Sequence, residues 1–446
     1  MPVDLLIRGG TLVTQEAVTE ADIAIEDGTI VAVGDLHDTA RDEINATGLH
    51  IFAGLIDSHV HFNEPGRTHW EGIATGSAAL AVGGGTTFID MPLNSSPPVL
   101  TSEAFDAKAD VGQAKSRCDF ALWGGLTPTN LDHLATLADR GVVGFKAFMC
   151  GSGIDDFLAV NDESLYTGMT TAAQLGLPVA VHAESQTITA AHTKLAQGRN
   201  DHSWQAWTVS RPVIAEVEAI QRALAFAEDT GCALHIVHVS SARAAQLVHQ
   251  TKQQQHLDVT CETCPHYLAL TADDLPDLGA RAKCAPPLRD EANQADLWDE
   301  LLAGTFDVVG SDHSPAPPDM KSDDDAFAAW GGIAGVQSTL SLLLSHTPEP
   351  PLPLLTRLTA TNPAQRFRLP RKGQLAPGHD ADLTLVDLSE NFALTRDMLH
   401  DRHRLNPYTG RTLTGRPVRT LLRGQTTALD GQPVGKPLGK LLTPEA

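Results

Sequence analysis

Two histidines separated by one residue stand at positions 59 and 61, in the run His59-Val60-His61. Strand side chains alternate between the two faces, so histidines at positions i and i+2 of a strand point to the same side. Two imidazoles on one face are a chelating pair for a divalent metal ion. The spacing therefore predicts part of a metal site. The alternative is a pair of histidines on the surface or in a loop.

Three more residues with ligand chemistry close apolar runs further along the chain: His182, His238 and Asp312. Each alone is typical of a polar residue whose hydrogen bonds are satisfied by its surroundings. Together with His59 and His61 they would converge if the runs were neighbouring strands of one barrel. Four histidines and one aspartate exceed the three protein ligands of a typical catalytic site with one zinc ion.

Lys146 lies inside the apolar run 142–148. A buried lysine is costly unless it is paired or neutralised, and one interpretation is a salt bridge with a nearby carboxylate. The other is carbamylation by carbon dioxide, which converts the ammonium into an anion with two oxygens that can bridge two metals. Two metals about 3.5–4 Å apart would polarise a carbonyl and lower the pKa of water.

The elements that must position these residues are short apolar runs that alternate with helix-like segments. The eight strand-like runs cover residues 55–61, 86–91, 120–125, 142–148, 178–182, 233–239, 258–262 and 306–312. The clearest helix-like segments between them cover residues 75–81, 130–139, 215–229, 242–249 and 292–303. This order predicts an α/β fold, a (β/α)8 TIM-type barrel with the polar residues at one mouth. An open doubly wound sheet is the alternative, but its first strand usually leads into a glycine-rich loop.

Both ends of the chain show short strand-like runs separated by glycine turns. They cover residues 4–8, 11–14, 22–26 and 29–33 near the start, and 381–386, 411–414, 418–423 and 426–429 near the end. Neither group is large enough for a core by itself. We therefore expect a small β-sandwich domain formed by both termini, from residues 1–53 and 376–446, with the barrel at 54–375.

The composition narrows the classes of partner. The 446 residues include 55 acidic and 32 basic side chains, for a net charge of −23. That charge argues against nucleic acid or an anionic membrane as the main partner. Six cysteines are too few for a disulfide scaffold. Cys261 and Cys264 form a single Cys-x-x-Cys motif, which we interpret as two cysteines that pack in the core. No apolar run approaches a membrane span of about 18 residues and the N-terminus does not read as a signal peptide, so we expect a cytoplasmic protein.

The motifs around these residues resemble the amidohydrolase superfamily, in its cyclic amidohydrolase branch of dihydroorotases, hydantoinases and allantoinases. The matching segments are 54–61, the run around Lys146, 181–184, 238–240 and 311–315. The resemblance covers nearly the whole chain. It implies a barrel with a β-sandwich built from both ends, and a homotetramer.

The resemblance also implies roles for the six residues. His59 and His61 would hold the more buried of two divalent ions, and His182 and His238 the more exposed one. Lys146 would be an N6-carboxylysine bridging both ions. Asp312 would bind the buried ion and act as the general base. Zinc is the expected metal, although histidine, carboxylate and carbamate also accept cobalt, manganese or iron.

Within the branch, segments 61–68, 90–95, 144–150 and 330–335 are most similar to the allantoinases. This implies that the ring of allantoin is opened to allantoate. Dihydroorotases usually carry arginine where Asn63 stands, to pair a substrate carboxylate. Hydantoinases usually carry a tyrosine shortly after the bridging lysine, and segment 148–150 has none.

The substrate contacts expected on this basis are Asn63, Asn94, Ala285 and Gly332. Allantoinases often have serine where Ala285 stands, so a contact there would come from the backbone. Arg67 either reaches the pocket or holds its loop through a salt bridge, such as one to Glu64 or Glu71. The alternatives for function are a hydantoinase or dihydropyrimidinase, a dihydroorotase, and a catalytically inactive scaffold homologue.

Overall fold

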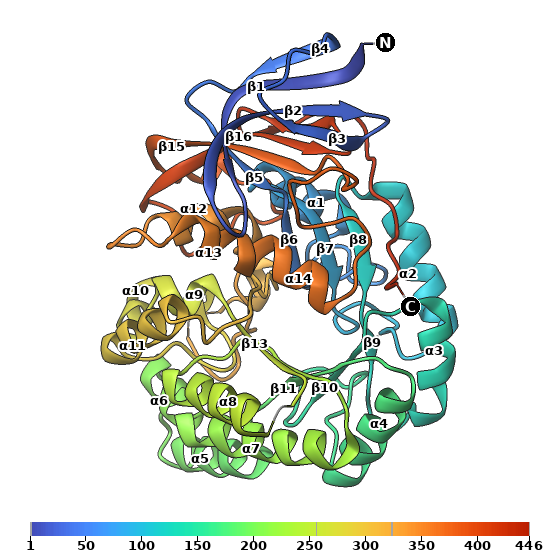
Figure 1. Cartoon of the computed structure of the whole chain (residues 1–446). Coiled ribbons are helices and arrows are strands. Elements are labelled where there is room, and N and C mark those ends of the chain that lie inside the picture. Colours follow the sequence, from blue (N-terminus) through green and yellow to red (C-terminus); the bar gives the residue numbers. More distant parts are fainter. Residues whose placement is uncertain (1, 256, 323, 446) are drawn as a thin grey trace.

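The computed structural model describes residues 2–255, 257–322 and 324–445. At its centre a ring of parallel strands is surrounded by helices (Figure 1). In chain order the strands are β6 (Leu55–Val60), β7 (Gly85–Asp90), β8 (Asp119–Leu122) with its continuation β9 (Gly124–Gly125), β10 (Phe145–Phe148), β11 (Val179–His182), β12 (Leu234–Ile236), β13 (Val259–Thr263) and β14 (Val308–Val309).

Two parallel sheets close this ring. One has the order β6-β7-β8 and the other β14-β13-β12-β11-β10-β9. Only Trp123 separates β8 from β9, so the two sheets join there. At the other seam Val60, the last residue of β6, forms a parallel bridge with His313, which follows β14. The predicted α/β barrel is therefore confirmed, and the carboxyl ends of its strands share one mouth.

The helices that follow the strands pack outside the ring, and some of them begin at a capping residue. They include α1 (Ile73–Val82), α2 (Ser102–Lys115), α3 (Leu134–Arg140), α4 (Asp162–Gln174), α7 (Val213–Thr230), α8 (Ala242–Gln255) and α11 (Glu291–Leu302). The Thr101 hydroxyl accepts the amide of Ala104 at the start of α2, and Asp290 accepts that of Asn293 at the start of α11. Two helices that the sequence analysis did not single out, α5 (Gln186–Gly198) and α6 (Trp204–Ser210), follow β11 beside the mouth.

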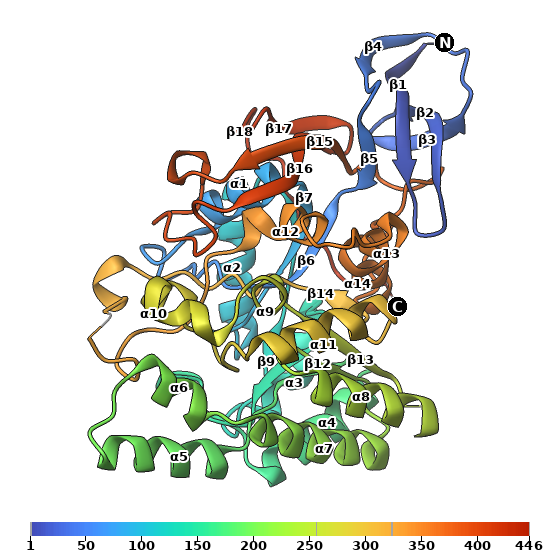
Figure 2. The same cartoon turned by 90° about the vertical axis from the view of Figure 1, so that its left-hand side faces the viewer.

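The two ends of the chain meet in one sheet of nine strands, as expected. These are β1 (Val3–Val13), β2 (Val18–Glu26), β3 (Thr29–Gly34), β4 (Ala40–Asn45), β5 (His50–Ala53), β15 (Leu383–Ala393), β16 (Thr412–Leu422), β17 (Gln425–Leu429) and β18 (Gln432–Pro433). Strand β5 joins the halves, because it pairs in parallel with β1 and antiparallel with β15. Figure 2 shows the N-terminal strands on one side of β5 and the C-terminal strands on the other.

Two expected strand breaks are wrong. The runs 4–8 and 11–14 form the single strand β1, which crosses Gly9 and Gly10 with a register shift. The runs 411–414 and 418–423 likewise lie within or beside β16, which passes through Gly415 at φ 76°. A glycine inside a strand can mark a bulge as well as a turn, and the sequence alone does not distinguish them.

A buried charge cluster fastens the terminal sheet to the barrel. The Lys372 ammonium lies 2.6 Å from Asp119 of β8 and 2.8 Å from both Asp380 and Asp382, which precede β15. The four side chains are almost completely buried. Three carboxylates around one lysine could otherwise suggest a cation site, but here the ammonium is the cation.

All six cysteines are buried and unpaired, so the packing interpretation of Cys261 and Cys264 is confirmed. Among the helices of the described residues, none is long and apolar enough to cross a membrane.

Candidate metal centre

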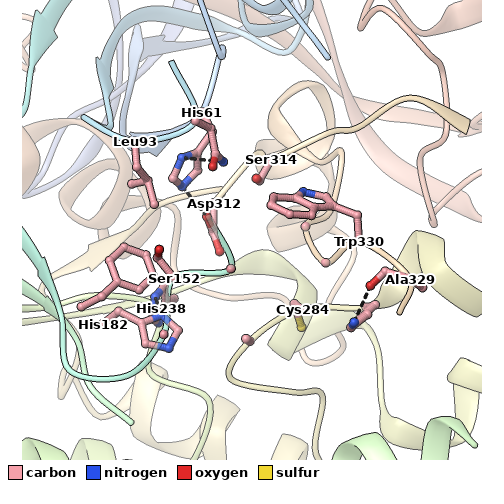
Figure 3. A pocket seen from close by; sticks show the side chains of 18 of the residues that line it. His61, Leu93, Ser152, His182, His238, Cys284, Asp312, Ser314, Ala329 and Trp330 are labelled. Carbon is pink, nitrogen blue, oxygen red and sulfur yellow. Dashed lines mark hydrogen bonds and ion pairs between the residues drawn. The ribbon is translucent and has the colours of Figure 1, made fainter. Parts of the chain in front are cut away.

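Five of the six predicted site residues come from four strand ends and line a cavity of about 390 Å³ at the mouth of the barrel. Figure 3 shows His61 and Asp312 close together, with His182 and His238 beside them. Lys146 stands within β10 behind the cavity wall, and the other five residues line the cavity itself. The convergence that the sequence suggested is therefore present in the structure.

The first group joins the His-x-His pair to Asp312. Nε2 of His59 and Nε2 of His61 each lie 3.3 Å from Oδ1 of Asp312, and one ligand atom from each residue falls within 4.8 Å of the others. Burial alone would raise the pKa of Asp312, but His59 and His61 hold it below its ordinary value. The carboxylate is therefore ionised at neutral pH, as a metal ligand must be.

The second group is a pair of imidazoles. Nδ1 of His182 lies 3.0 Å from Nε2 of His238, and burial lowers the pKa of both residues, so neither ring is cationic at neutral pH. The His238 ring centroid is 5.4 Å from that of His59, which places the two groups side by side. His238 and Asp312 have left-handed backbones, with φ of 40° and 45°. Strained backbones of this kind cluster at functional sites.

Two buried glutamates orient the imidazoles. Glu262 of β13 lies 2.8 Å from Nδ1 of His59 and accepts a 2.6 Å hydrogen bond from Ser58. Glu184 lies 2.7 Å from Nε2 of His182 and also accepts hydrogen bonds from the Arg211 guanidinium. In each case the carboxylate binds one ring nitrogen, and the other nitrogen lies against the rest of the site: Nε2 of His59 beside Asp312 and Nδ1 of His182 beside His238. This is the usual arrangement around metal-binding histidines.

Lys146 is completely buried, and its Nζ makes no hydrogen bond with any described residue. No described carboxylate lies within 4.0 Å of Nζ, so the salt-bridge interpretation finds no partner here. Burial lowers the pKa of Lys146 to about 8, although Asp312 and Glu262 act in the opposite direction. A buried amine without a partner is a costly arrangement that a bound group would relieve.

These donors fit divalent metal ions. The site combines imidazole rings and an ionised carboxylate that line one cavity with a buried amine of lowered pKa close by. Imidazole and carboxylate are the ligands of catalytic zinc sites. The structure therefore supports metal dependence.

Three of the four expected substrate contacts line the cavity: Asn94, Ala285 and Gly332. Asn63 does not line it. Its side-chain amide faces the Pro315 carbonyl at 3.4 Å, and its Oδ1 is buried without a described partner.

Arg67 does not line the cavity either. It holds its loop through a salt bridge, but the partner is Asp156 at 3.0 Å and not Glu64 or Glu71. Its guanidinium also donates to the backbone carbonyls of Asn94 and Ser95, each at 3.3 Å. Arg67 therefore supports the loop that carries Asn94.

Several site residues were missed from the sequence. Glu184 and Glu262 had a usable signal, because each stands at a strand end, and Glu184 lies two residues beyond His182. Arg211 follows the short helix α6 and has no local sequence pattern that indicates its place. Lys283 begins segment 283–289, which resembles a substrate-lining loop of the family, but only Ala285 was expected to be a contact there. Arg211 and Lys283 both line the cavity, so its wall contains two basic residues.

A strand-end histidine and carboxylate cluster in a (β/α)8 barrel defines a class of metal-dependent hydrolases. The model of the amidohydrolase family matches residues 50–427. The chain belongs to the amidohydrolase family. It is 54% identical to the allantoinase of Deinococcus radiodurans over the full length of both chains. It is 52% identical to the allantoinase of Solibacter usitatus over 99% of this chain and 97% of that one.

Among solved structures, the L-hydantoinase (dihydropyrimidinase) from Arthrobacter aurescens superposes with a TM-score of 0.96. That protein is 34% identical to this chain, and the match covers 99% of this chain and all of the other. The fold is therefore shared with hydantoinases, whereas the higher identities are to allantoinases.

Proposed function

We propose that the cavity opens the hydantoin ring of allantoin to give allantoate, so that the chain acts as an allantoinase on the C–N bond of a cyclic amide. The observation that carries the proposal is the convergence of four histidines and Asp312 on one cavity, with Lys146 buried close by and its Nζ without a described hydrogen-bond partner. The identity of the substrate follows from the full-length similarity to allantoinases.

The metal centre would hold two divalent ions, most simply zinc. His59 and His61 with Asp312 would hold one ion, and His182 with His238 the other. Lys146 would be carboxylated by carbon dioxide and bridge them, which supplies the partner that its Nζ otherwise lacks. A pKa lowered to about 8 favours this reaction, because only the neutral amine attacks carbon dioxide. Such ions polarise a carbonyl and lower the pKa of water.

Residues of the chain would transfer the proton and keep the histidine ligands in place. Asp312 accepts a proton from the attacking water and passes it to the ring nitrogen as the C–N bond breaks. The water oxygen becomes part of the new carboxylate, so no other reactant is needed. Glu262 and Glu184 keep His59 and His182 in fixed orientations. Phe148 stacks on His182 with 4.7 Å between the ring centroids and lines the same cavity.

A hydantoinase or dihydropyrimidinase is the second candidate, favoured by the close superposition on the L-hydantoinase. A dihydroorotase needs a cation for the substrate carboxylate, and Arg211 and Lys283 in the cavity could supply one. Dihydroorotate is therefore included among the substrates to be tested. A catalytically inactive scaffold would be expected to have lost ligands, yet all six residues are present.

We also propose a homotetramer in the cytoplasm, as the family resemblance implies. The buried, unpaired state of all six cysteines is consistent with a reducing compartment.

The experiment is a comparison of substrates on one preparation. Purified protein supplied with zinc and bicarbonate is given allantoin, dihydroorotate, dihydrouracil and hydantoin, and kcat/KM is measured for each. The proposal predicts that allantoin has the highest kcat/KM. Higher efficiency on dihydroorotate would contradict it, and higher efficiency on hydantoin or dihydrouracil would favour the second candidate.

A further inference from the structure

Lys283 is a buried cation in the cavity wall opposite the histidines. It is only 4% exposed, and its Nζ lies 4.0 Å from the centre of the Trp207 ring. The ammonium donates to the Ala329 carbonyl, which is its one hydrogen bond to a described residue. An ammonium has three donors, so two remain for a ligand.

No carboxylate neutralises this ammonium within the described chain, because no salt bridge to Lys283 is present at 4.0 Å or less. The nearby Arg211 differs, since it is paired with Glu184. An aromatic face such as that of Trp207 attracts a cation without removing its charge or its donors. Lys283 is therefore the cavity cation that remains available to a hydrogen-bond acceptor.

The position of Lys283 fits one part of the substrate. Figure 3 shows His61, His182, His238 and Asp312 on one side of the cavity, with Ala329 and Trp330 across from them. Lys283 belongs to the Ala329 side through its hydrogen bond. A substrate held beside the histidines would therefore have its far side toward the wall that carries Lys283.

We propose that Lys283 binds the carbonyl oxygen of the ureido arm and is a specificity-determining residue for 5-ureido over apolar 5-alkyl hydantoins. This inference rests on the proposed function. The contact expected at Asn63 is not available for this role, because Asn63 faces Pro315 and does not line the cavity.

A purely structural role would be a latch. Lys283 also contacts segment 329–332 through its backbone, since its carbonyl accepts a hydrogen bond from the amide of Gly332 at 2.7 Å. Lys321 holds the same segment, because its Nζ donates to the Gly332 carbonyl at 2.6 Å, but Lys321 does not line the cavity. Both lysines support segment 329–332, but only Lys283 lines the cavity. Comparing variants of the two therefore distinguishes a role in substrate binding from a role in supporting the segment.

The test compares Lys283→Met with Lys321→Met on two substrates, allantoin and 5-propylhydantoin, whose arm has a similar length but no acceptor. For Lys283→Met we expect kcat/KM for allantoin to fall by about 10- to 100-fold, mainly through a higher KM, because a hydrogen bond from a charged donor is lost. The value for 5-propylhydantoin should stay within about twofold.

Lys321→Met should change both substrates by the same factor, since Lys321 does not line the cavity and donates to the backbone carbonyls of Ala280 and Gly332. Equal losses on both substrates in Lys283→Met would overturn the inference and leave Lys283 as a latch, as would a fall confined to kcat. Wild-type activity on allantoin tests the proposed function separately, because the inference depends only on the ratios between variant and wild type.

Discussion

Lys146 is the residue that places the strongest demand on its surroundings, since it is buried with no described hydrogen-bond partner. Lys146→Ala should lose most of the bound metal and activity, because the proposed bridge between the ions disappears. Small carboxylic acids added to the variant should restore part of both by taking the place of the carbamate. Elemental analysis and allantoin hydrolysis measure the effect.

Lys194→Ala, on the exposed face of α5, is the matched control and should keep wild-type metal content and activity. A Lys146→Ala protein that is fully loaded with metal and fully active would show that this lysine bridges nothing.

Asp312 carries two roles in the proposed reaction, as ligand and as proton acceptor. Asp312→Asn should lower kcat by at least about 10²–10⁴-fold, the range for loss of one general base. Steady-state kinetics on allantoin, with metal content measured in parallel, test this. Asp299→Asn, on the exposed side of α11, serves as the control.

Near-normal turnover by Asp312→Asn with both ions bound would move the base elsewhere. His266 would then be the next candidate, since burial lowers its pKa to about 4 and neither ring nitrogen has a described partner.

At the residue scale, the sequence was informative where chemistry coincides with a strand end. His59, His61, His182, His238 and Asp312 could be found because each closes an apolar run, and Lys146 because it interrupts one. Arg211 could not be found, since it reaches the cavity only through the tertiary fold, and resemblance in segment 283–289 indicated Ala285 and not Lys283. Asn63 was a plausible contact by position, yet its left-handed backbone, with φ 62°, accompanies a side chain that faces Pro315.

At the scale of elements, the approach of β10 to β11 fixes where Lys146 stands. A Cβ on Gly144, just before β10, would lie 2.5 Å from the backbone oxygen of Pro178, which precedes β11. The same oxygen accepts the amide of Phe145 at 2.9 Å. Gly144→Ala should therefore push the two strands apart and destabilise the protein by about 1–3 kcal/mol. Thermal unfolding and metal content are the measurements.

Gly198→Ala is the matched control, because a Cβ there meets no atom within 4 Å and α5 tolerates alanine. Equal melting temperatures and equal metal content for the two variants would contradict the close contact between β10 and β11.

Strand order was predictable because parallel barrel strands are buried on both faces and read as continuous apolar runs. The exact strand limits were less predictable. Glycines 9, 10 and 415 read as breaks, but cross-strand pairing carries β1 and β16 through them. Helices α5 and α6 lie beyond the simple strand-helix alternation, as an insertion after β11.

At the scale of the whole molecule, the cluster around Lys372 attaches the terminal sheet to the barrel. Burial alone would lower the pKa of Lys372, but Asp382 and Asp119 hold it above its ordinary value. A raised lysine pKa gives stabilisation that is complete below the unfolded value, about 10.4, and lost only as the pH rises through the folded value. The wild-type contribution should therefore be constant from pH 5 to 8.

Lys372→Met leaves buried carboxylates without their ammonium, which costs about 3–5 kcal/mol for a broken buried pair. Burial also raises the pKa of Asp382, so protonation at lower pH should relieve part of this cost. The free energy of unfolding should therefore differ from wild type more at pH 8 than at pH 5. Lys436→Met, at an exposed position, is the control. A difference that grows toward pH 5 would contradict this description of the cluster.

The central claim is that the two groups of ligands form one hydrolytic centre that needs both ions. The most direct measurement is to remove metal with a chelator, add zinc back in known amounts with bicarbonate present, and follow allantoin hydrolysis against ions bound per chain. We predict little activity without metal and full activity only as binding approaches two ions per chain. Full activity at one ion per chain, or activity that survives complete removal of metal, would contradict the claim.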